Sequence, residues 1–225
     1  MSVLFENRQL VVPGELLAEG DFMAGEGAYR ENGKIIASLI GLAALKGKTI
    51  YVTALAGSYI PYIDDIVIGK VYNISLTSWH VDICSPYAGI LHISNVIRRP
   101  FNASKSDLRE IFDVGDIIVA KIIAFDRLQD PALTVKGRDL GKLRGGTIIE
   151  IPPSKIPRLI GRKGSMINMI KEQTQARIAV GQNGRIWILG KEAGDEIQVI
   201  RAIRKIEREA HTTGLTDRVR ELFVD

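Results

Sequence analysis

The sequence predicts a multidomain protein that is mainly β and ends in an α/β segment. Strand-like runs fill residues 1–138, and turn residues separate them at short intervals. From residue 147 the pattern changes to a mixture of strands and helices. The longest helical pattern repeats Val199, Ile203 and Ile206 along one stripe. With 225 residues, the chain suits two or three small domains.

Residues 1–62 form the first predicted domain, a small β domain. Asn32 and Gly33 stand between two strand-like runs, and this pair favours the left-handed backbone of a tight hairpin turn. Gly47 marks a second turn before the run TIYVTAL. Because the segment is short for an independent globular domain, we expect it to pack on a neighbouring domain or on a partner.

Residues 63–138 are predicted to form a small closed barrel. Five runs have strand composition: DIVIGKVYNIS, SWHVDIC, GILHIS, VGDIIVAKIIAF and PALTVKG. Five short strands of this kind favour the OB-fold, a five-stranded barrel. Between the third and fourth runs lies a polar stretch, in which a short helix is predicted near residues 107–112.

Residues 139–146, DLGKLRGG, have the composition of a linker, and residues 147–225 are predicted to form an α/β domain with a C-terminal extension. The expected order is a strand, a short helix, a charged corner, a second helix, two strands joined at residues 182–184, and the long helix. Trp187 alternates with two isoleucines in the last strand. We expect it to pack in the core, on the sheet face that meets the helices.

Positive charge is concentrated late in the chain. Residues 136–210 hold 16 Lys and Arg against 8 Asp and Glu, whereas residues 1–135 hold 12 against 15. The formal net charge of the whole chain is only +4. This asymmetry indicates that the late segment binds a polyanion such as nucleic acid.

The single cysteine, Cys84, excludes an intrachain disulfide and a cysteine-based zinc site, and it fits a reducing compartment. The chain opens without a signal-peptide pattern. Its longest apolar run is far shorter than the roughly 20 residues that span a bilayer. We therefore expect a cytoplasmic protein that does not contact a membrane, with no cofactor and no bound metal.

No spacing in the sequence is typical of a catalytic site. His80, His92 and His211 share no metal-ligand spacing, and neither an HExxH motif nor a Walker-type phosphate loop occurs. Asp64 and Asp65 are adjacent before a strand, so their side chains are expected on opposite faces, unable to share a proton or a metal ion. The sequence therefore predicts a protein that is not an enzyme.

The corner Gly161-Arg162-Lys163-Gly164 is the strongest candidate binding site. Its glycines permit a sharp turn and a close approach of a phosphate, and free N–H groups near Ser165 favour an anion. The alternative is a plain turn between two helices with solvated cations. The motif and its β-α-GxxG-α-β-β-α surroundings resemble a type I KH domain, which implies that the loop clamps the backbone of about four nucleotides.

The barrel segment resembles the S1-type branch of the OB-fold, which implies RNA binding by base stacking in a basic groove. The resemblance places His92 at the family's histidine position, and Thr77 and His80 at two usually aromatic positions, with Trp79 beside them. The cations available to contact phosphate are Lys70, Arg98, Arg99, Lys105 and Lys121. Because residues 63–135 hold 7 cations against 9 anions, a mainly structural barrel is the alternative.

The N-terminal segment, with PGE at residues 13–15 and GEGAY at residues 25–29, completes a three-part order. This order of N-terminal β domain, S1-type barrel and KH domain resembles the RNA-binding cap subunits of archaeal exosomes, of the ribosomal-RNA-processing-protein-four type. The sister cap subunit carries a zinc ribbon instead. A single cysteine cannot build that ribbon, so the sister family is disfavoured.

The resemblance implies a trimeric cap, made of three copies or mixed with the zinc-ribbon sister, on a ring of ribonuclease-PH-like subunits. The N-terminal domain is then expected to dock on the ring. The cap is expected to capture single-stranded RNA and to guide its 3′ end to the central pore for 3′-to-5′ phosphorolysis. The alternative is a free-standing RNA-binding regulator of transcription or translation that uses the same two modules.

Overall fold

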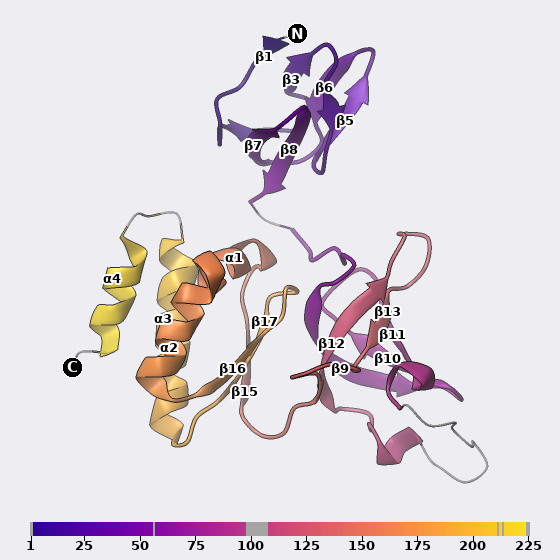
Figure 1. Cartoon of the computed structure of the whole chain (residues 1–225), viewed down its shortest axis with the longest axis vertical. Coiled ribbons are helices and arrows are strands. Elements are labelled where there is room, and N and C mark those ends of the chain that lie inside the picture. The colour runs from indigo at the N-terminus through magenta and orange to yellow at the C-terminus, as the bar shows by residue number, and fades with distance from the viewer. Residues whose placement is uncertain (1, 56, 98–107, 211, 213, 224–225) are drawn as a thin grey trace. The chain divides into compact units, whose positions relative to one another are not determined.

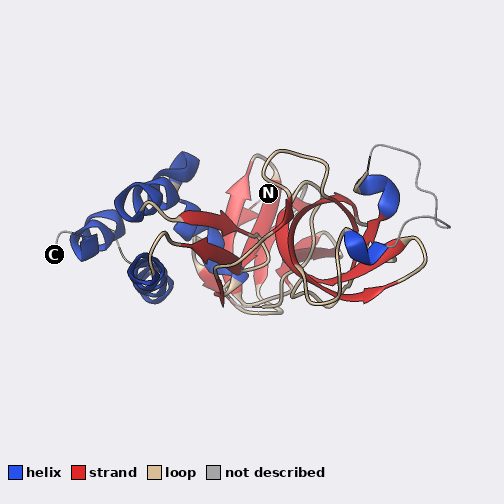
Figure 2. Ribbon diagram, turned by 90° about the horizontal axis from the view of Figure 1, so that it is seen from below, coloured by secondary structure: helices blue, strands red, loops and turns tan. Residues whose placement is uncertain are grey.

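The computed structural model describes residues 2–55, 57–97, 108–210, 212 and 214–223. The chain divides into two compact units, Met1–Gly57 and Ser58–Asp225, and each is described by itself. Figure 1 labels the elements of both units, and Figure 2 colours them by secondary structure.

The N-terminal unit consists of two four-stranded sheets. The first sheet has the strand order β1 (Ser2–Val3), β3 (Leu16–Glu19), β6 (Lys34–Ala37), β5 (Ala28–Glu31). The second has the order β2 (Leu10–Val11), β7 (Gly41–Lys46), β8 (Thr49–Ala54), β4 (Met23–Ala24). Alternate side chains of these strands form one buried cluster that includes Leu17, Ile35, Ile50 and Val52.

Both hairpins predicted for this unit are present. Strands β5 and β6 are antiparallel and meet at Asn32 and Gly33, whose φ angles are 48° and 77°. Strands β7 and β8 meet at Gly47, with φ 64°. Positive φ angles are the reason why Asn and Gly mark such turns, because other side chains clash there.

The C-terminal unit begins with a closed five-stranded barrel, as the sequence predicted. Its strands are β9 (Ile66–Ile74), β10 (Ser78–Asp82), β11 (Gly89–His92), β12 (Ile117–Ala124) and β13 (Ala132–Thr134). They follow the order β13-β11-β10-β9-β12, and a β13–β12 pairing closes the ring. Figure 2 shows the curvature of these strands around the barrel. Inward side chains such as Val71, Trp79, Val81 and Leu91 fill the interior.

Two segments beside the barrel add detail to the prediction. The short helix predicted near residues 107–112 is present as a 3-10 turn, Leu108–Glu110, and another 3-10 turn, Ile93–Asn95, precedes the undescribed stretch. The stretch predicted as a linker contains a strand, β14 (Gly141–Lys142), which pairs with β12. The connection to the next domain is therefore partly built into the barrel sheet.

The rest of the chain forms an α/β domain around a three-stranded antiparallel sheet of order β15-β17-β16. The strands are β15 (Thr147–Glu150), β16 (Arg177–Val180) and β17 (Arg185–Leu189). The helices are α1 (Ile156–Ile160), α2 (Ser165–Thr174), α3 (Ala193–Glu209) and α4 (Leu215–Arg220), with 3-10 turns at Pro153–Lys155, Arg162–Gly164 and Glu221–Phe223. The element order up to α3 is the predicted one.

Helices α1, α2 and α3 cover one face of this sheet (Figure 1). The predicted stripe of α3, Val199, Ile203 and Ile206, is fully buried there. Helix α4 adds Leu215 and Val219 to the same core. Among the described residues, no helix combines the length and the apolar character that crossing a membrane requires.

The other face of the sheet is also buried, which the sequence analysis did not predict. Trp187 is 5% exposed, so its burial is confirmed, but its ring packs with Ile68 and Val119 of the barrel instead of with the helices. Its Nε1 donates a hydrogen bond to the Gly145 carbonyl at 2.7 Å. Since Ile186 and Ile188 pack toward the helices, β17 is buried on both sides.

Candidate nucleic-acid interface

The charged corner between α1 and α2 depends on left-handed backbone. The φ angles of Gly161, Lys163 and Gly164 are 74°, 52° and 83°. A Cβ atom at Gly161 would lie 2.8 Å from the backbone nitrogen of Met166, closer than real Cβ atoms approach backbone. Glycine at this position therefore lets α1 and α2 meet at a sharp corner, and it leaves the corner open to a ligand.

Two cations extend from this corner into solvent. Arg162 and Lys163 are both exposed, and within the described part of the chain neither forms an ion pair. Helix α2 begins directly after the corner, and no side chain caps its first turn. The N–H of Ser165 already bonds the Arg162 carbonyl, so the attraction for an anion such as a phosphate comes from the positive end of the helix dipole and from the two adjacent cations.

The barrel presents a second candidate surface, the outer face of β9, β10 and β11. Lys70, His80 and His92 lie on this face, and all are exposed or half-buried. Residue pairing across the strands places Lys70 opposite Asp82 and His92 opposite Ser78. His80 Nε2 lies 2.8 Å from the Ser75 hydroxyl, which orients the imidazole ring. The structure therefore brings these three predicted residues onto one surface.

Tyr72 belongs to the same face and was missed by the sequence analysis. Its side chain is 49% exposed, and its ring centroid lies 6.1 Å from that of His80, with an interplanar angle of 59°. The β9–β10 pairing shifts register between His80 and Val81, so that Tyr72 lies between the paired residues Val71 and Asn73. The strand period contained a signal, because Tyr72 is two residues from the outward-facing Lys70.

Trp79 does not belong to this face, contrary to the prediction. It is 0% exposed, and its Nε1 donates a hydrogen bond to the Phe112 carbonyl at 2.8 Å. Its ring meets that of Phe112 edge to face at 5.4 Å. The strand alternates, so His80 points out of the barrel and Trp79 points in. The indole is a core residue and is not available for base stacking.

Of the remaining predicted cations, the structure describes only Lys121, and it does not lie with the others. Lys121 lies on β12 opposite Ile66, at the end of β9 far from Lys70, and forms a 2.6 Å ion pair with Asp64. Arg98, Arg99 and Lys105 lie outside the described residues.

The carboxylates of Asp64 and Asp65 have separate partners, as their predicted orientations require. Asp65 accepts a hydrogen bond from the Tyr59 hydroxyl at 2.5 Å, while Asp64 pairs with Lys121. Burial raises the pKa of Asp65 above its ordinary value. Among the described residues, no group of three or more His, Cys, Asp or Glu side chains is placed to hold a metal ion.

The two candidate surfaces are held together by the turn between β16 and β17. Asn183, predicted only as part of a hairpin turn, is 3% exposed because the turn inserts against the barrel. Its Nδ2 donates hydrogen bonds to the carbonyls of Ile68 and Ile83 at 2.8 and 2.9 Å, and its Oδ1 accepts one from the Ile68 N–H at 3.2 Å. One side chain thus satisfies three backbone groups of another domain.

Arg185 strengthens the same contact with charge. Its guanidinium bonds Asp82 of the barrel at 2.6 Å and Glu150 of β15 at 2.9 Å. The hydrogen bond from Arg185 lowers the pKa of Glu150. Burial works to raise the pKa of Asp82, but hydrogen bonds from Arg185 and from the Cys84 N–H outweigh it and lower that pKa. Both carboxylates therefore stay ionised and paired at neutral pH.

Three family models match consecutive parts of the chain. The model described as "Exosome RNA binding protein RRP4 N-terminal domain" matches residues 8–56, and "RRP4, S1 domain" matches residues 58–124. A KH-domain model matches residues 146–194. Helix α4 lies beyond the last of these matches.

Relatives match almost the full length of the chain. Proteins named "Exosome complex component Rrp4" from Thermococcus kodakarensis and Pyrococcus furiosus are 48% identical over 99% of this chain, which covers 87% and 85% of their lengths. A similarly named protein of Methanobrevibacter smithii is 46% identical over 97% of this chain and 72% of its own length. A crystal structure of an exosome complex RNA-binding protein is 41% identical, with a TM-score of 0.69 over 74% of this chain and 95% of that one.

Proposed function

Since the chain belongs to the Rrp4 family of exosome proteins, we propose that it is a non-catalytic RNA-binding subunit of an archaeal exosome. Three copies, alone or mixed with a zinc-ribbon sister, form a cap that captures single-stranded RNA and guides its 3′ end to the pore of a phosphorolytic ring. The observation that carries the proposal is the full-length match to Rrp4 relatives together with an open, doubly charged GxxG corner.

Contact with phosphate is the main source of RNA affinity in this proposal. Arg162 and Lys163 are exposed at a corner where the positive end of the α2 dipole also favours an anion. Tyr72 and His80 supply ring surfaces on the barrel, where bases can stack without sequence preference. A subunit that feeds RNA to a degrading ring needs this combination, because the strand must be held and still move.

The N-terminal unit is the part proposed to dock on a ring of ribonuclease-PH-like subunits. Its described residues include exposed large apolar side chains: Val3, Leu4, Leu10, Val12, Met23, Tyr29, Ile40, Leu45 and Leu55. Where such side chains form a contiguous exposed patch, the patch is typical of a protein–protein contact. Docking would cover this surface and would concentrate the two RNA-binding surfaces at the pore.

Replacing the two corner cations tests the phosphate contact. The double variant Arg162→Gln/Lys163→Gln is expected to bind a short single-stranded RNA about tenfold or more weakly in 0.1 M salt, with the salt slope reduced by roughly one to two. The measurement is fluorescence anisotropy titration at several salt concentrations. The control is Arg201→Gln/Arg208→Gln, which removes equal charge from exposed positions of α3. If both double variants lost the same RNA affinity, binding would depend on the overall positive charge of the domain and not on a specific phosphate contact at the corner.

The size of the native assembly distinguishes the proposal from a free-standing regulator. We expect native mass measurement of the protein purified from its source cell to give a large complex that contains ring subunits. A monodisperse single chain would favour the regulator. Phosphate-dependent RNA degradation that follows the isolated chain through purification would contradict the non-catalytic role.

A further inference from the structure

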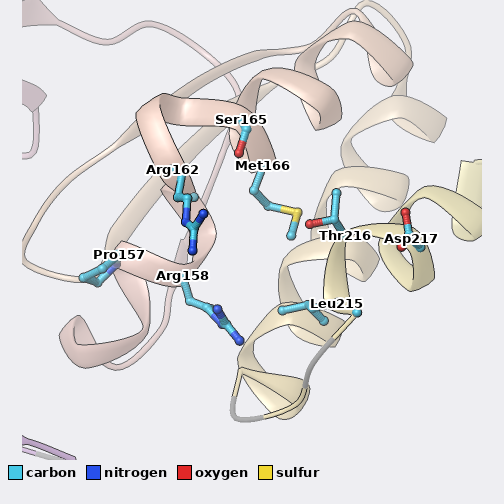
Figure 3. Close-up of a pocket in the computed structure, with 10 residues that line it drawn as sticks. Pro157, Arg158, Arg162, Ser165, Met166, Leu215, Thr216 and Asp217 are labelled. Atoms are coloured by element: carbon cyan, nitrogen blue, oxygen red, sulfur yellow. The ribbon is translucent and has the colours of Figure 1, made fainter. Parts of the chain in front are cut away.

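A cavity of about 510 Å³ lies between the GxxG corner and helix α4. One wall comes from α1, the corner and the start of α2, and the other from the first turn of α4. Figure 3 shows Arg158 and Arg162 on one side, Thr216 on the other, and Met166 and Leu215 between them. Its volume is within the roughly 300–1,000 Å³ typical of small-molecule sites.

The second wall is held in place by specific bonds. Arg158 on α1 donates hydrogen bonds from Nε to the Ala210 carbonyl at 2.8 Å and from a terminal nitrogen to the Thr212 carbonyl at 3.0 Å. On α4, Leu215 and Val219 are buried in the core of the domain. The position of α4 beside the corner is therefore a built feature of the fold, although the KH model that matches this chain ends at residue 194.

The chemistry of the cavity differs from one side to the other. The floor is apolar, since Met166 and Leu215 are each 4% exposed. At one rim, the Arg162 guanidinium can only donate hydrogen bonds. At the opposite rim, the exposed Asp217 carboxylate only accepts them, and it also pairs with Arg220 at 3.7 Å. The cavity therefore fits a ligand with acceptor oxygens at one end, an apolar face, and a hydrogen-bond donor at the other end.

We propose that this cavity holds the nucleotide next to the phosphate bound at the GxxG corner. Its phosphate oxygens face Arg162, its sugar or base lies on Met166 and Leu215, and a donor group of the nucleotide bonds Asp217. That donor is a ribose hydroxyl or a base amino group. The inference rests on the proposed RNA-binding function and assigns to α4 the second wall of the nucleotide site.

The sign of one charge change tests the assignment. Removing a carboxylate near a polyanion should slightly strengthen binding if the carboxylate makes no contact, whereas loss of a hydrogen bond to a charged acceptor weakens it. Asp217→Ala is therefore expected to bind an oligoadenylate RNA of about eight nucleotides roughly tenfold more weakly than the wild type. Thr216→Val, which removes the neighbouring hydroxyl without changing side-chain size, is expected to weaken binding less.

Glu221→Ala is the matched control, because it removes the same charge from the exposed end of α4, outside the cavity. It should leave RNA affinity unchanged or slightly higher, and thermal unfolding should be alike for all three variants. Titration with oligoadenylate DNA identifies the donor. A loss confined to RNA assigns the ribose hydroxyl, and equal losses with RNA and DNA assign the base.

If the Asp217→Ala variant binds RNA as tightly as the wild type, or more tightly, the cavity assignment is wrong. This failure is distinct from failure of the proposed function. If the phosphate contact at the corner were wrong, the Arg162→Gln/Lys163→Gln variant would keep its affinity, whatever the result at Asp217.

Discussion

Asn183→Ala is expected to destabilise the C-terminal unit by about 2–4 kcal/mol. The substitution removes three hydrogen bonds at a buried contact and leaves backbone groups of Ile68 and Ile83 without them. A net hydrogen bond contributes about 1 kcal/mol, and an unsatisfied buried group costs roughly 1–3 kcal/mol. Denaturant unfolding of the full chain measures the loss.

The neighbouring residue provides the control for this substitution. Gln182→Ala leaves the turn intact, because Gln182 bonds the barrel through its backbone N–H, at 2.7 Å from the Ile66 carbonyl. It should change stability by less than about 0.5 kcal/mol. If Asn183→Ala also changed the unfolding free energy by less than this amount, the proposed role of the Asn183 amide would be contradicted.

The same variant reports on how the two proposed RNA-binding surfaces cooperate. If Asn183 and Arg185 hold the barrel and the KH domain at a fixed distance, an RNA long enough to reach both surfaces binds bivalently. Asn183→Ala should then lose more affinity for a long RNA than for an oligonucleotide that reaches only the GxxG corner. Equal losses would show that the surfaces bind independently.

Trp79→Ala is expected to have the largest effect of any single substitution in the barrel, about 3–5 kcal/mol. Removal of a fully buried indole leaves a cavity among Phe112, Val81 and Leu91, which can collapse only in part. The loss of the bond from the indole N–H to the Phe112 carbonyl adds to the effect. Chemical unfolding followed by circular dichroism measures it.

Trp79→Phe separates a core role from a binding role. Phenylalanine keeps most of the apolar volume and an aromatic ring, so the protein should fold with a smaller loss of stability. If Trp79 is a core residue, RNA affinity of this folded variant equals that of the wild type. A folded Trp79→Phe protein with weakened RNA binding would contradict the burial of the indole.

Features set by neighbouring residues were predictable. The Asn32-Gly33 turn, the Gly47 turn and the stripe of Val199 on α3 follow from backbone preferences and from side-chain periods of two or 3.6. The GxxG corner was predictable for the same reason. Position 161 lies so close to the backbone of Met166 that only glycine fits there. The same strand period would have placed Tyr72 beside Lys70, had it been applied there.

Features set by contacts between distant segments were not predictable. The pattern of β17 showed that Trp187 is buried, but only the packed domains show that the barrel covers it. In the sequence, Asn183 has only the properties of a turn residue. Its contact with Ile68, 115 positions earlier, is visible only in the folded structure. Helix α4 likewise gains its proposed role only from its position opposite the GxxG corner.

By itself the sequence determined the order of the modules, the barrel strands, the element order of the KH domain up to α3, and the charged corner proposed to bind phosphate. The tertiary structure decided that Trp79 points into the barrel core and that Trp187 packs against the barrel. It also decided how the barrel and the KH domain are joined. The physical reason is that turns and side-chain periods are local properties of the chain. Whether the second face of a sheet is buried depends on a distant segment that packs against it, and this is not a local property.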